Sequence, residues 1–317
     1  MAGNAGEVSD AAPAPLRVRR QPVAAILRRT FRRLPLHLLV IFLALLWSIP
    51  TLALLLSSFR EPGDVVTSGW WNAFTHPFDL TLANYEDVLT TRSMDRAFIN
   101  SLIITIPSTF FVVLVAAFAA YAFAWMQFPG RNALFIVMVG LLVVPLQMTL
   151  IPVLRLYTDL TIDAEMPLLG GRVFGTSSYI GIWMAHTAYG LPFAVYLLRN
   201  FFGSIPRDIL ESAYIDGASD ARIFFRLIIP LSMPAIAALT IFQFLWVWND
   251  LLVSLILLGD PELAPMTLRI SSLVSSFGTQ YQLLTAAAFI SMALPLAIFF
   301  ALQRYFVQGI LAGSVKG

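Results

Sequence analysis

Six long apolar runs constrain this chain more than any other feature of its sequence. The first covers residues 36–58, and five more follow at about 98–125, 134–156, 179–201, 235–258 and 283–305. An α-helix needs about 20 apolar residues to cross a bilayer. Backbone polar groups inside lipid must be paired within the protein, which favours helices. The sequence therefore predicts an all-α integral membrane protein with six transmembrane helices.

The composition agrees with a membrane environment. The chain is 58% hydrophobic and only 12% charged, whereas soluble domains are about half apolar and a quarter charged. It contains no cysteine, which excludes disulfides, thiolate metal sites and a cysteine nucleophile. A formal net charge of +2 gives little support to a nucleic-acid-binding function.

Residues 1–34 are predicted to be a separate, unstructured tail. The segment is rich in Ala, Pro and Gly and has too little apolar surface to fold alone. Its seven basic residues are Arg17, Arg19, Arg20, Arg28, Arg29, Arg32 and Arg33. Arginines before a first span set its orientation, so a nucleic-acid-binding arm is the less favoured interpretation. Residues 35–97 would then hold the first span and an external loop, and residues 98–317 the core domain.

The basic residues between the spans predict the topology. With the N-terminus in the cytoplasm, that side collects 14 Lys and Arg residues and the opposite side six. Basic residues accumulate in cytoplasmic loops, so both termini and the polar stretch 205–234 are predicted to be cytoplasmic.

The first external loop, at about 60–97, is rich in aromatic residues. It contains Trp70, Trp71, Phe74, Phe78 and Tyr85. Two interpretations remain open for these rings, an aromatic belt at the membrane interface and a surface that meets an external partner.

The stretch 205–234 is the longest polar interruption between the later spans. Pro206 suits the start of a helix, and Gly217 is expected to end that helix. A second helix is expected from Ser219, which would cap it, to Ile229, with Pro230 and Pro234 ending it. An ordinary cytoplasmic loop would explain the charges but not this organisation, so we expect a docking element.

The residues of this stretch resemble the EAA motif of the membrane subunits of binding-protein-dependent ABC importers. The motif reads Glu-Ala-Ala, three residues, Gly, nine residues and Ile-x-Leu-Pro. The matching positions here are Glu211, Ser212, Ala213, Gly217, Leu227, Ile229 and Pro230. Substitutions at Ser212, Leu227 and Ile229 keep a small or aliphatic side chain. Leu191-Pro192-Phe193, Trp248-Asn249-Asp250 and the C-terminal GILAGSVKG make the chain similar to the MalG-like carbohydrate permeases in particular.

This resemblance implies the type I ABC importer (MetI-like) permease fold, with a cytoplasmic coupling-helix loop. It also implies a multi-pass subunit of the bacterial cytoplasmic membrane that forms half of a translocation pathway for a sugar. The implied partners are a second homologous permease, two copies of an ATPase subunit, an extracytoplasmic sugar-binding protein and membrane lipid. The segment 67–77 (TSGWWNAFTHP) looks similar to permeases for α-glucosides or glucosylglycerol.

The sequence contains no motif for chemistry of its own. A phosphate-binding Gly-x-x-x-x-Gly-Lys-Ser/Thr loop is missing, and Lys316 is the only lysine. His37, His76 and His186 are scattered, without metal-ligand spacing. We therefore expect no catalytic residue, metal or bound cofactor in this subunit, and ATP and Mg²⁺ would be used by the partner ATPase.

Polar residues within the later spans are candidates for the substrate pathway. Ionisable groups inside a membrane usually face a polar interior, and Asp250 is the clearest case. Its carboxylate could bind a sugar beside the stacking faces of Trp246 or Trp248, or it could cap a helix, which is the interpretation that we favour. The other candidates are Asn249, His186, Tyr189 and Gln243.

Two alternatives to a sugar importer remain. ABC importers for amino acids, polyamines or phosphonates share the EAA motif, although their C-termini generally lack the Gly-x-Val-Lys-Gly ending. A secondary transporter working without an ATPase would show charged or broken helices at the midplane and an inverted repeat, and the sequence shows no convincing repeat.

Overall fold

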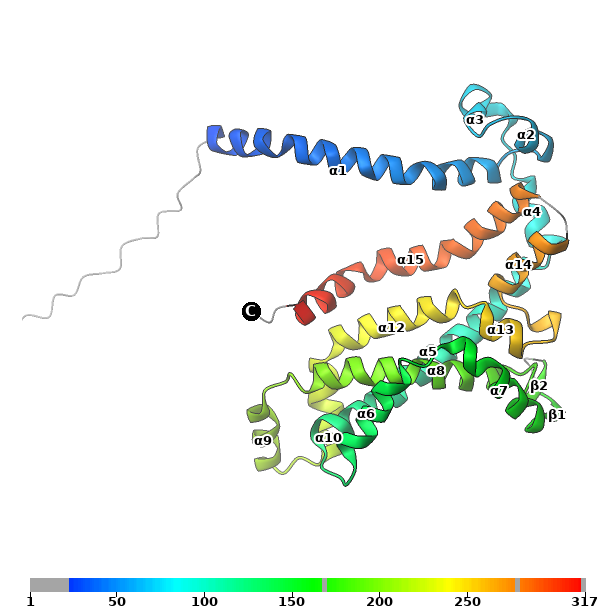
Figure 1. The fold of residues 1–317 in the computed structure, drawn as a ribbon. Helices are drawn as coiled ribbons and strands as arrows, with labels where there is room; N and C mark the ends of the chain where they lie inside the picture. The colour runs from blue at the N-terminus through cyan, green and yellow to red at the C-terminus, as the bar shows by residue number, and fades with distance from the viewer. Residues whose placement is uncertain (1–22, 167–169, 277–279, 315–317) are drawn as a thin grey trace, which may run out of the picture. The chain divides into compact units, whose positions relative to one another are not determined.

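The computed structural model describes residues 23–166, 170–276 and 280–314, and these residues are predominantly helical (Figure 1). The chain divides into two units, residues 1–53 and 54–317.

Most of the first unit is the N-terminal part of helix α1 (Val23–Ser58). Residues 33–58 are long and apolar enough to cross a membrane, which confirms the first expected span. The helix begins at Val23, so the last part of the tail that we expected to be unstructured is helical instead. Residues 1–22 of that tail lie outside the described residues.

The second unit is built on four long helices, α5 (Met94–Trp125), α8 (Tyr179–Phe202), α12 (Met233–Trp248) and α15 (Tyr281–Ser314). Helices α5 and α8 form its central pair. The side chains of Ala116, Ala120 and Ala194 are 0% exposed in the core between these helices. Small side chains let helix backbones approach closely, and larger buried side chains such as Leu198 and Phe202 fill the rest of this core.

Two of the expected spans are broken helices. The run predicted at 134–156 is split into α6 (Arg131–Leu141) and α7 (Leu146–Asp159), which are bent by 102°. Pro145 precedes α7 with an extended backbone, and a residue before proline avoids the helical region. The run predicted at 235–258 ends as a helix at Trp248, and the short helix α13 (Leu252–Leu257) follows after a break.

Short elements gather at the two opposite ends of the second unit (Figure 1). One end holds α2 (Pro62–Thr67), α3 (Asn72–Thr75), η1 (Pro77–Asp79), α4 (Ala83–Thr90), β1 (Ile162–Glu165), β2 (Arg172–Phe174), η3 (Pro261–Leu263) and α14 (Met266–Ser276). The other end holds α9 (Arg207–Ile215), α10 (Asp220–Ile223), the π-helical turn η2 (Phe224–Ile228) and α11 (Ile229–Leu231).

Strands β1 and β2 form an antiparallel hairpin, in which Ile162 pairs with Phe174 and Glu165 with Arg172. The expected all-α architecture therefore carries one small β-hairpin at the end opposite α9.

Among the described residues, three helices could each span a membrane by length and composition, and five spans result if each bent pair is counted as one. The bent pairs are α6 with α7, and residues 220–231 with α12. The remaining expected span, at 179–201, corresponds to helix α8, which has 24 residues, or about 36 Å at 1.5 Å per residue. This helix is not among the candidate spans by length and composition.

Candidate functional site

Helix α9 lies on the surface with one side anchored in the core. Leu210 is 2% exposed, and Ala213 packs against the same hydrophobic cluster that holds α5 and α8 together. Glu211 and Ser212 are exposed, and the Ile215 side chain is 86% exposed. A largely exposed Ile215, one helical turn from the exposed carboxylate of Glu211 on an anchored helix, is suited to docking another protein.

Gly217 ends this helix in the left-handed backbone conformation, with φ of +77°. The amide of Ala218 donates to the carbonyl of Ala213 across the turn, at 3.0 Å. A Cβ atom added to Gly217 would meet nothing within 4 Å. Within this chain, glycine is therefore required by the backbone conformation rather than by crowding.

Ser219 begins the next helix, α10, as its sequence predicted. Its hydroxyl accepts a hydrogen bond from the amide of Arg222 at 3.4 Å, which satisfies one of the unpaired donors of the first helical turn.

Asp220 connects this loop to two other elements. Its carboxylate accepts a hydrogen bond from the Tyr214 hydroxyl on α9 at 2.6 Å and one from the Tyr121 hydroxyl on α5 at 3.4 Å. Donation to this carboxylate is the main cause of a raised pKa at Tyr214. Tyr121 was not predicted, because nothing in the pattern of an apolar span indicates which tyrosine will face a loop 99 positions away.

The segment after α10 is a π-helical turn whose aromatic rings pack on α5. The Phe224 ring stacks on Phe118 with centroids 4.9 Å apart and meets Tyr121 edge-on at 5.3 Å. Leu227 and Ile229 pack against the same core, while Pro230 is exposed.

The two prolines of this segment act differently from our expectation. Pro230 lies within the continuous helical stretch 220–231, one residue before its end at Leu231, and does not stop it. The helix instead breaks after Leu231, just before α12, where Pro234 occupies the first turn, and the two parts are bent by 75°.

A buried polar cluster lies between α8 and the end of α12. His186 and Gln243 are each 3% exposed, and their Nε2 atoms have no hydrogen-bond partner within the described part of the chain. His186 Nε2 lies 3.8 Å from a carboxylate oxygen of Asp250. Gln243 lies directly against Gly190, since a Cβ there would sit 2.7 Å from its Nε2 atom. The structure thus brings together two of the predicted pathway residues, His186 and Asp250, while Gln243 contacts α8 at Gly190.

Asp250 lies in the break after α12 rather than within a continuous span, and it caps α13. Its carboxylate oxygens accept hydrogen bonds from the amides of Val253 at 3.4 Å and Ser254 at 3.2 Å. Thr267 donates to its backbone carbonyl at 2.6 Å. This geometry matches the capping interpretation of the residue, while one side of the carboxylate still faces His186.

The remaining pathway candidates are separated from this cluster. Trp248 is 2% exposed, its Nε1 donates to the carbonyl of Ser291 at 3.1 Å, and its ring packs between those of Phe98 and Phe244. Its ring therefore offers no face to a substrate here. Asn249 is exposed and donates to the carbonyl of Leu245 at 2.7 Å. Tyr189 accepts a hydrogen bond from Thr149 on α7 at 3.1 Å.

Across the part of the chain that the structure describes, no group of three or more His, Asp or Glu side chains could hold a metal ion. The arrangement provides an exposed docking helix at one end and a small buried polar cluster in the helical body.

Comparison with known proteins identifies relatives over most of the chain. Residues 96–312 match the family described as "Binding-protein-dependent transport system inner membrane component". The chain is 54% identical to the osmoprotective compounds uptake permease protein GgtD of Synechocystis sp., over 90% of this chain and 93% of the relative. It is 41% identical to the alpha-glucoside transport system permease protein AglG of Rhizobium meliloti, over 90% and 99%.

A solved structure has the same fold. A chain of a bacterial ABC transporter involved in the import of the acidic polysaccharide alginate superimposes with a TM-score of 0.69 at 21% identity, covering 88% of this chain and 97% of that chain. The expected permease fold of ABC importers is thereby confirmed.

Proposed function

The chain belongs to the family of binding-protein-dependent transport system inner membrane components, and we propose that it is the permease subunit of an ATP-driven importer for a sugar. In this assignment it forms half of the translocation pathway, beside a second homologous permease. Two ATPase subunits hydrolyse ATP with Mg²⁺, and an extracytoplasmic binding protein delivers the substrate. This subunit itself carries no catalytic residue and binds no cofactor.

The observation that carries this proposal is the geometry of the loop from α9 to α10. Helix α9 presents Glu211, Ser212 and Ile215 outward while Leu210 fixes it to the core. A partner that binds this face and moves would also move α9, which is linked to α5 by the hydrogen bonds of Tyr214 and Tyr121 to Asp220. Closure of an ATPase dimer could then change the packing of the spans, provided that the two conformations bind the ATPase dimer differently.

The proposed substrate class follows from the relatives. AglG is named for alpha-glucoside transport, and the alginate transporter imports a polysaccharide. We assign a sugar, with an α-glucoside as the narrower proposal. The side chains of His186, Gln243 and Asp250 supply hydrogen-bonding groups of the kind that sugar hydroxyls require, and these residues are the proposed pathway contacts of this subunit.

The proposed topology places the α9–α10 end in the cytoplasm, where ATP is available. That end carries the exposed Arg207, Arg222 and Arg226, in keeping with the accumulation of basic residues on the cytoplasmic side. The end with α2 to α4 would then face outward, and both chain termini would be cytoplasmic.

Co-purification tests the assignment. The tagged protein would be extracted gently from its native membrane as wild type, as the Glu211→Ala/Gly217→Asp variant and as a control, Glu165→Ala, which changes an exposed carboxylate on β1 at the opposite end. We expect an ATPase to co-purify with wild type and control but not with the double variant. Wild type that is recovered without an ATPase, under conditions that preserve other membrane complexes, would contradict the proposal.

The substrate class is then tested on the purified complex. Reconstituted with its partner subunits and binding protein, it should import a labelled α-glucoside in an ATP-dependent way. ATP-dependent uptake of an amino acid but of no sugar would support an importer and contradict the assignment of a sugar as its substrate.

A further inference from the structure

An exposed apolar surface lies on the short elements at the end opposite α9. We call it the outer aromatic surface and define it by Val66, Trp71, Phe74, Phe78 and Leu82. These side chains are 76%, 60%, 69%, 98% and 68% exposed, respectively. The rings of Trp71 and Phe74 lie edge-on to Trp70, with centroids 6.0 and 6.2 Å away. Large exposed apolar side chains this frequent within one short segment of a folded protein indicate an interaction site.

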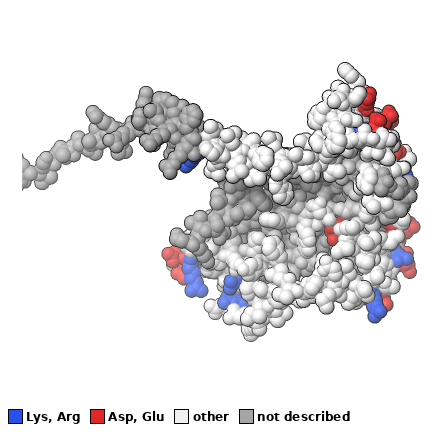
Figure 2. Space-filling view, turned by 45° about the horizontal axis from the view of Figure 1, so that its top comes forward, with Lys and Arg blue, Asp and Glu red and all other residues white. Residues whose placement is uncertain are grey.

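The exposed charged residues of the segment 61–91, which carries this surface, are all acidic. Between Glu61 and Thr91 the chain contains Glu61, Asp64, Asp79, Glu86 and Asp87 but no Lys or Arg. Glu61, Asp79 and Glu86 are exposed. Figure 2 shows acidic side chains gathered at the end of the second unit that carries α2 and α3.

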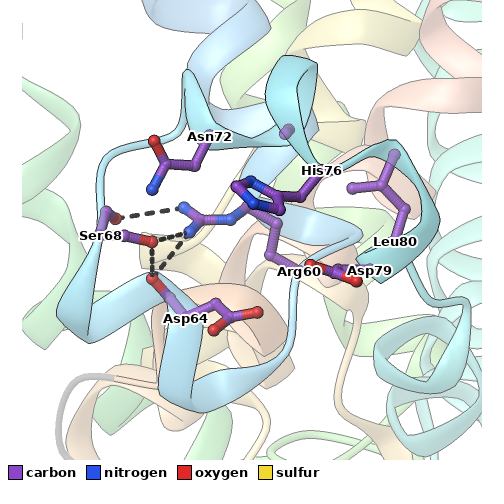
Figure 3. A pocket seen from close by; sticks show the side chains of 8 residues that line it. Arg60, Asp64, Ser68, Asn72, His76, Asp79 and Leu80 are labelled. Carbon is purple, nitrogen blue, oxygen red and sulfur yellow. Dashed lines mark hydrogen bonds between the residues drawn. The ribbon is translucent and has the colours of Figure 1, made fainter.

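Arg60 holds the surface in a fixed shape. Its side chain is buried at 5% exposure, and its guanidinium donates to the backbone carbonyls of Ser68 at 3.2 Å and Asp64 at 2.8 Å, and to the Ser68 hydroxyl. Arg60, Asn72, His76 and Asp79 line a polar cavity of about 220 Å³. Figure 3 shows the guanidinium of Arg60 with the other three side chains around it. The loop is thereby organised from within before any partner binds.

A second set of hydrogen bonds joins this loop to α4. The Asn84 side chain donates to the carbonyls of Ser58 at 2.9 Å and Arg60 at 2.8 Å. The hydroxyls of Ser58 and Tyr85 are 2.7 Å apart. Because α4 packs on α5 and α15, the outer aromatic surface is supported by the helical body and does not depend on a flexible loop.

Two occupants could cover such a surface, the membrane interface and a protein. Segments that lie in a membrane interface combine aromatic residues with Lys and Arg, since lipid surfaces are neutral or negative. Here the charged groups beside the rings are carboxylates, which an anionic lipid surface repels. A protein that offers basic groups around apolar sockets would satisfy both the rings and the carboxylates.

We propose that the outer aromatic surface is the docking site on this subunit for the extracytoplasmic binding protein, which contacts it through apolar sockets surrounded by Lys and Arg. The inference rests on the proposed function and names the residues that would contact the partner. Trp71 and Phe78 are the expected centre of the contact, because large exposed rings held on a rigid base dominate the binding energy of interfaces. The acidic residues would speed and orient the encounter.

The test measures binding of the purified binding protein to the complete transporter reconstituted in lipid nanodiscs. The Trp71→Ala/Phe78→Ala variant should bind more weakly, with a dissociation constant raised about tenfold or more. The matched control Thr75→Ala changes an exposed residue of α3, between Trp71 and Phe78 in the sequence, and should leave the dissociation constant unchanged. The Asp79→Asn/Glu86→Gln variant should slow association and reduce its dependence on salt. Unchanged binding by the aromatic double variant would overturn the proposal.

Fluorescence quenching by lipids tests the alternative, in which the membrane interface covers the outer aromatic surface. In nanodiscs containing brominated lipids, tryptophan fluorescence would be compared between wild type and Trp71→Phe. Quenching of the Trp71 contribution would place that ring in the bilayer and overturn the proposal, whereas protection from quenching supports it. The ATPase should still co-purify with the Trp71→Ala/Phe78→Ala variant, because loss of the docking site leaves the complex of permease and ATPase intact. Loss of the ATPase from wild type would instead contradict the proposed function.

Discussion

The hydroxyl of Tyr214 lies 2.6 Å from a carboxylate oxygen of Asp220 and donates a hydrogen bond to it. This bond bridges the turn at Gly217, with one partner on α9 and the other in α10. The same oxygen accepts from Tyr121 on α5. One carboxylate thus hydrogen-bonds both to α9 and to the central helix α5, in addition to the apolar contacts that hold this loop to the core.

Replacing Tyr214 with Phe should loosen this connection. The loss of one hydrogen bond to a carboxylate at an exposed site should reduce thermal stability slightly, by about 1 kcal/mol or less. Amide hydrogen exchange should rise at residues 216–222, and transport should fall relative to ATP hydrolysis. Tyr196→Phe, which removes the hydroxyl of an exposed tyrosine on α8, is the control. Equal exchange in wild type and Tyr214→Phe would show that the bond does not order the loop.

The same bond predicts a pH dependence. Its donation to Asp220 raises the pKa of Tyr214 above the ordinary tyrosine value of about 10. A raised pKa in the folded state means that the bond stabilises the loop below about pH 10 and loses its effect as the pH rises through the raised pKa. The difference in melting temperature between wild type and Tyr214→Phe should be constant near neutral pH and shrink above pH 10. A difference that grows with pH would contradict this assignment.

Substitutions at Gly217 should follow backbone preference. A left-handed φ of +77° disfavours residues with a Cβ, least of all Asn. Gly217→Ala should lower stability by about 1 kcal/mol, Gly217→Val by more, and Gly217→Asn by less. Since open space surrounds the added Cβ in this chain, a Gly217→Ala variant that loses only about 1 kcal/mol of stability but binds no ATPase would show that the partner occupies that space. Melting curves and ATPase co-purification together measure both effects.

The two interpretations of Asp250 can be separated. Asp250→Ala removes the acceptor for the amides of Val253 and Ser254 and should lower thermal stability by about 1 kcal/mol. Asp250→Asn retains an acceptor and should lose less. If the residue only caps α13, sugar uptake by correctly assembled transporter should be near normal in the Asn variant. A large loss of uptake without a loss of stability would establish a pathway role.

The loop from 205 to 234 could be predicted closely because its structure is determined locally. Gly217 adopts the left-handed conformation that only a few residue types accept, and Ser219 caps the helix that follows it. Local signals of this kind depend on neighbours in the sequence. Tyr121 was missed for the opposite reason, because its hydrogen bond to Asp220 depends on how two distant helices pack.

Continuity of the spans was the weakest part of the prediction. Hydropathy measures only how apolar a segment is, so it merged α6 with α7 and carried the fifth expected span past Trp248. Pro145 was a visible signal for the first break. The second break depends on Asp250, whose carboxylate replaces the missing bonds at the start of α13. A polar residue in an apolar run can therefore mark a helix end as well as a functional group.

The contact between Gly190 and Gln243 provides the sharpest test of the buried cluster. A methyl group at position 190 would lie 2.7 Å from Nε2 and 2.9 Å from Oε1 of Gln243, and Gln243 is 3% exposed and has little room to move. Gly190→Ala should therefore separate α8 from α12 and lower thermal stability by about 1–3 kcal/mol. Gln243→Ala should restore much of that loss in the double variant.

The four proteins form a double-mutant cycle, for which we predict the sign of the coupling free energy between positions 190 and 243. Because the clash requires both side chains, the double variant should be more stable than the sum of the two single changes predicts. Gly140→Ala, at a helical position where an added Cβ meets nothing within 4 Å, serves as the control and should not couple to Gln243→Ala. Strict additivity between positions 190 and 243 in melting measurements would mean that α8 and α12 do not pack against each other through this pair.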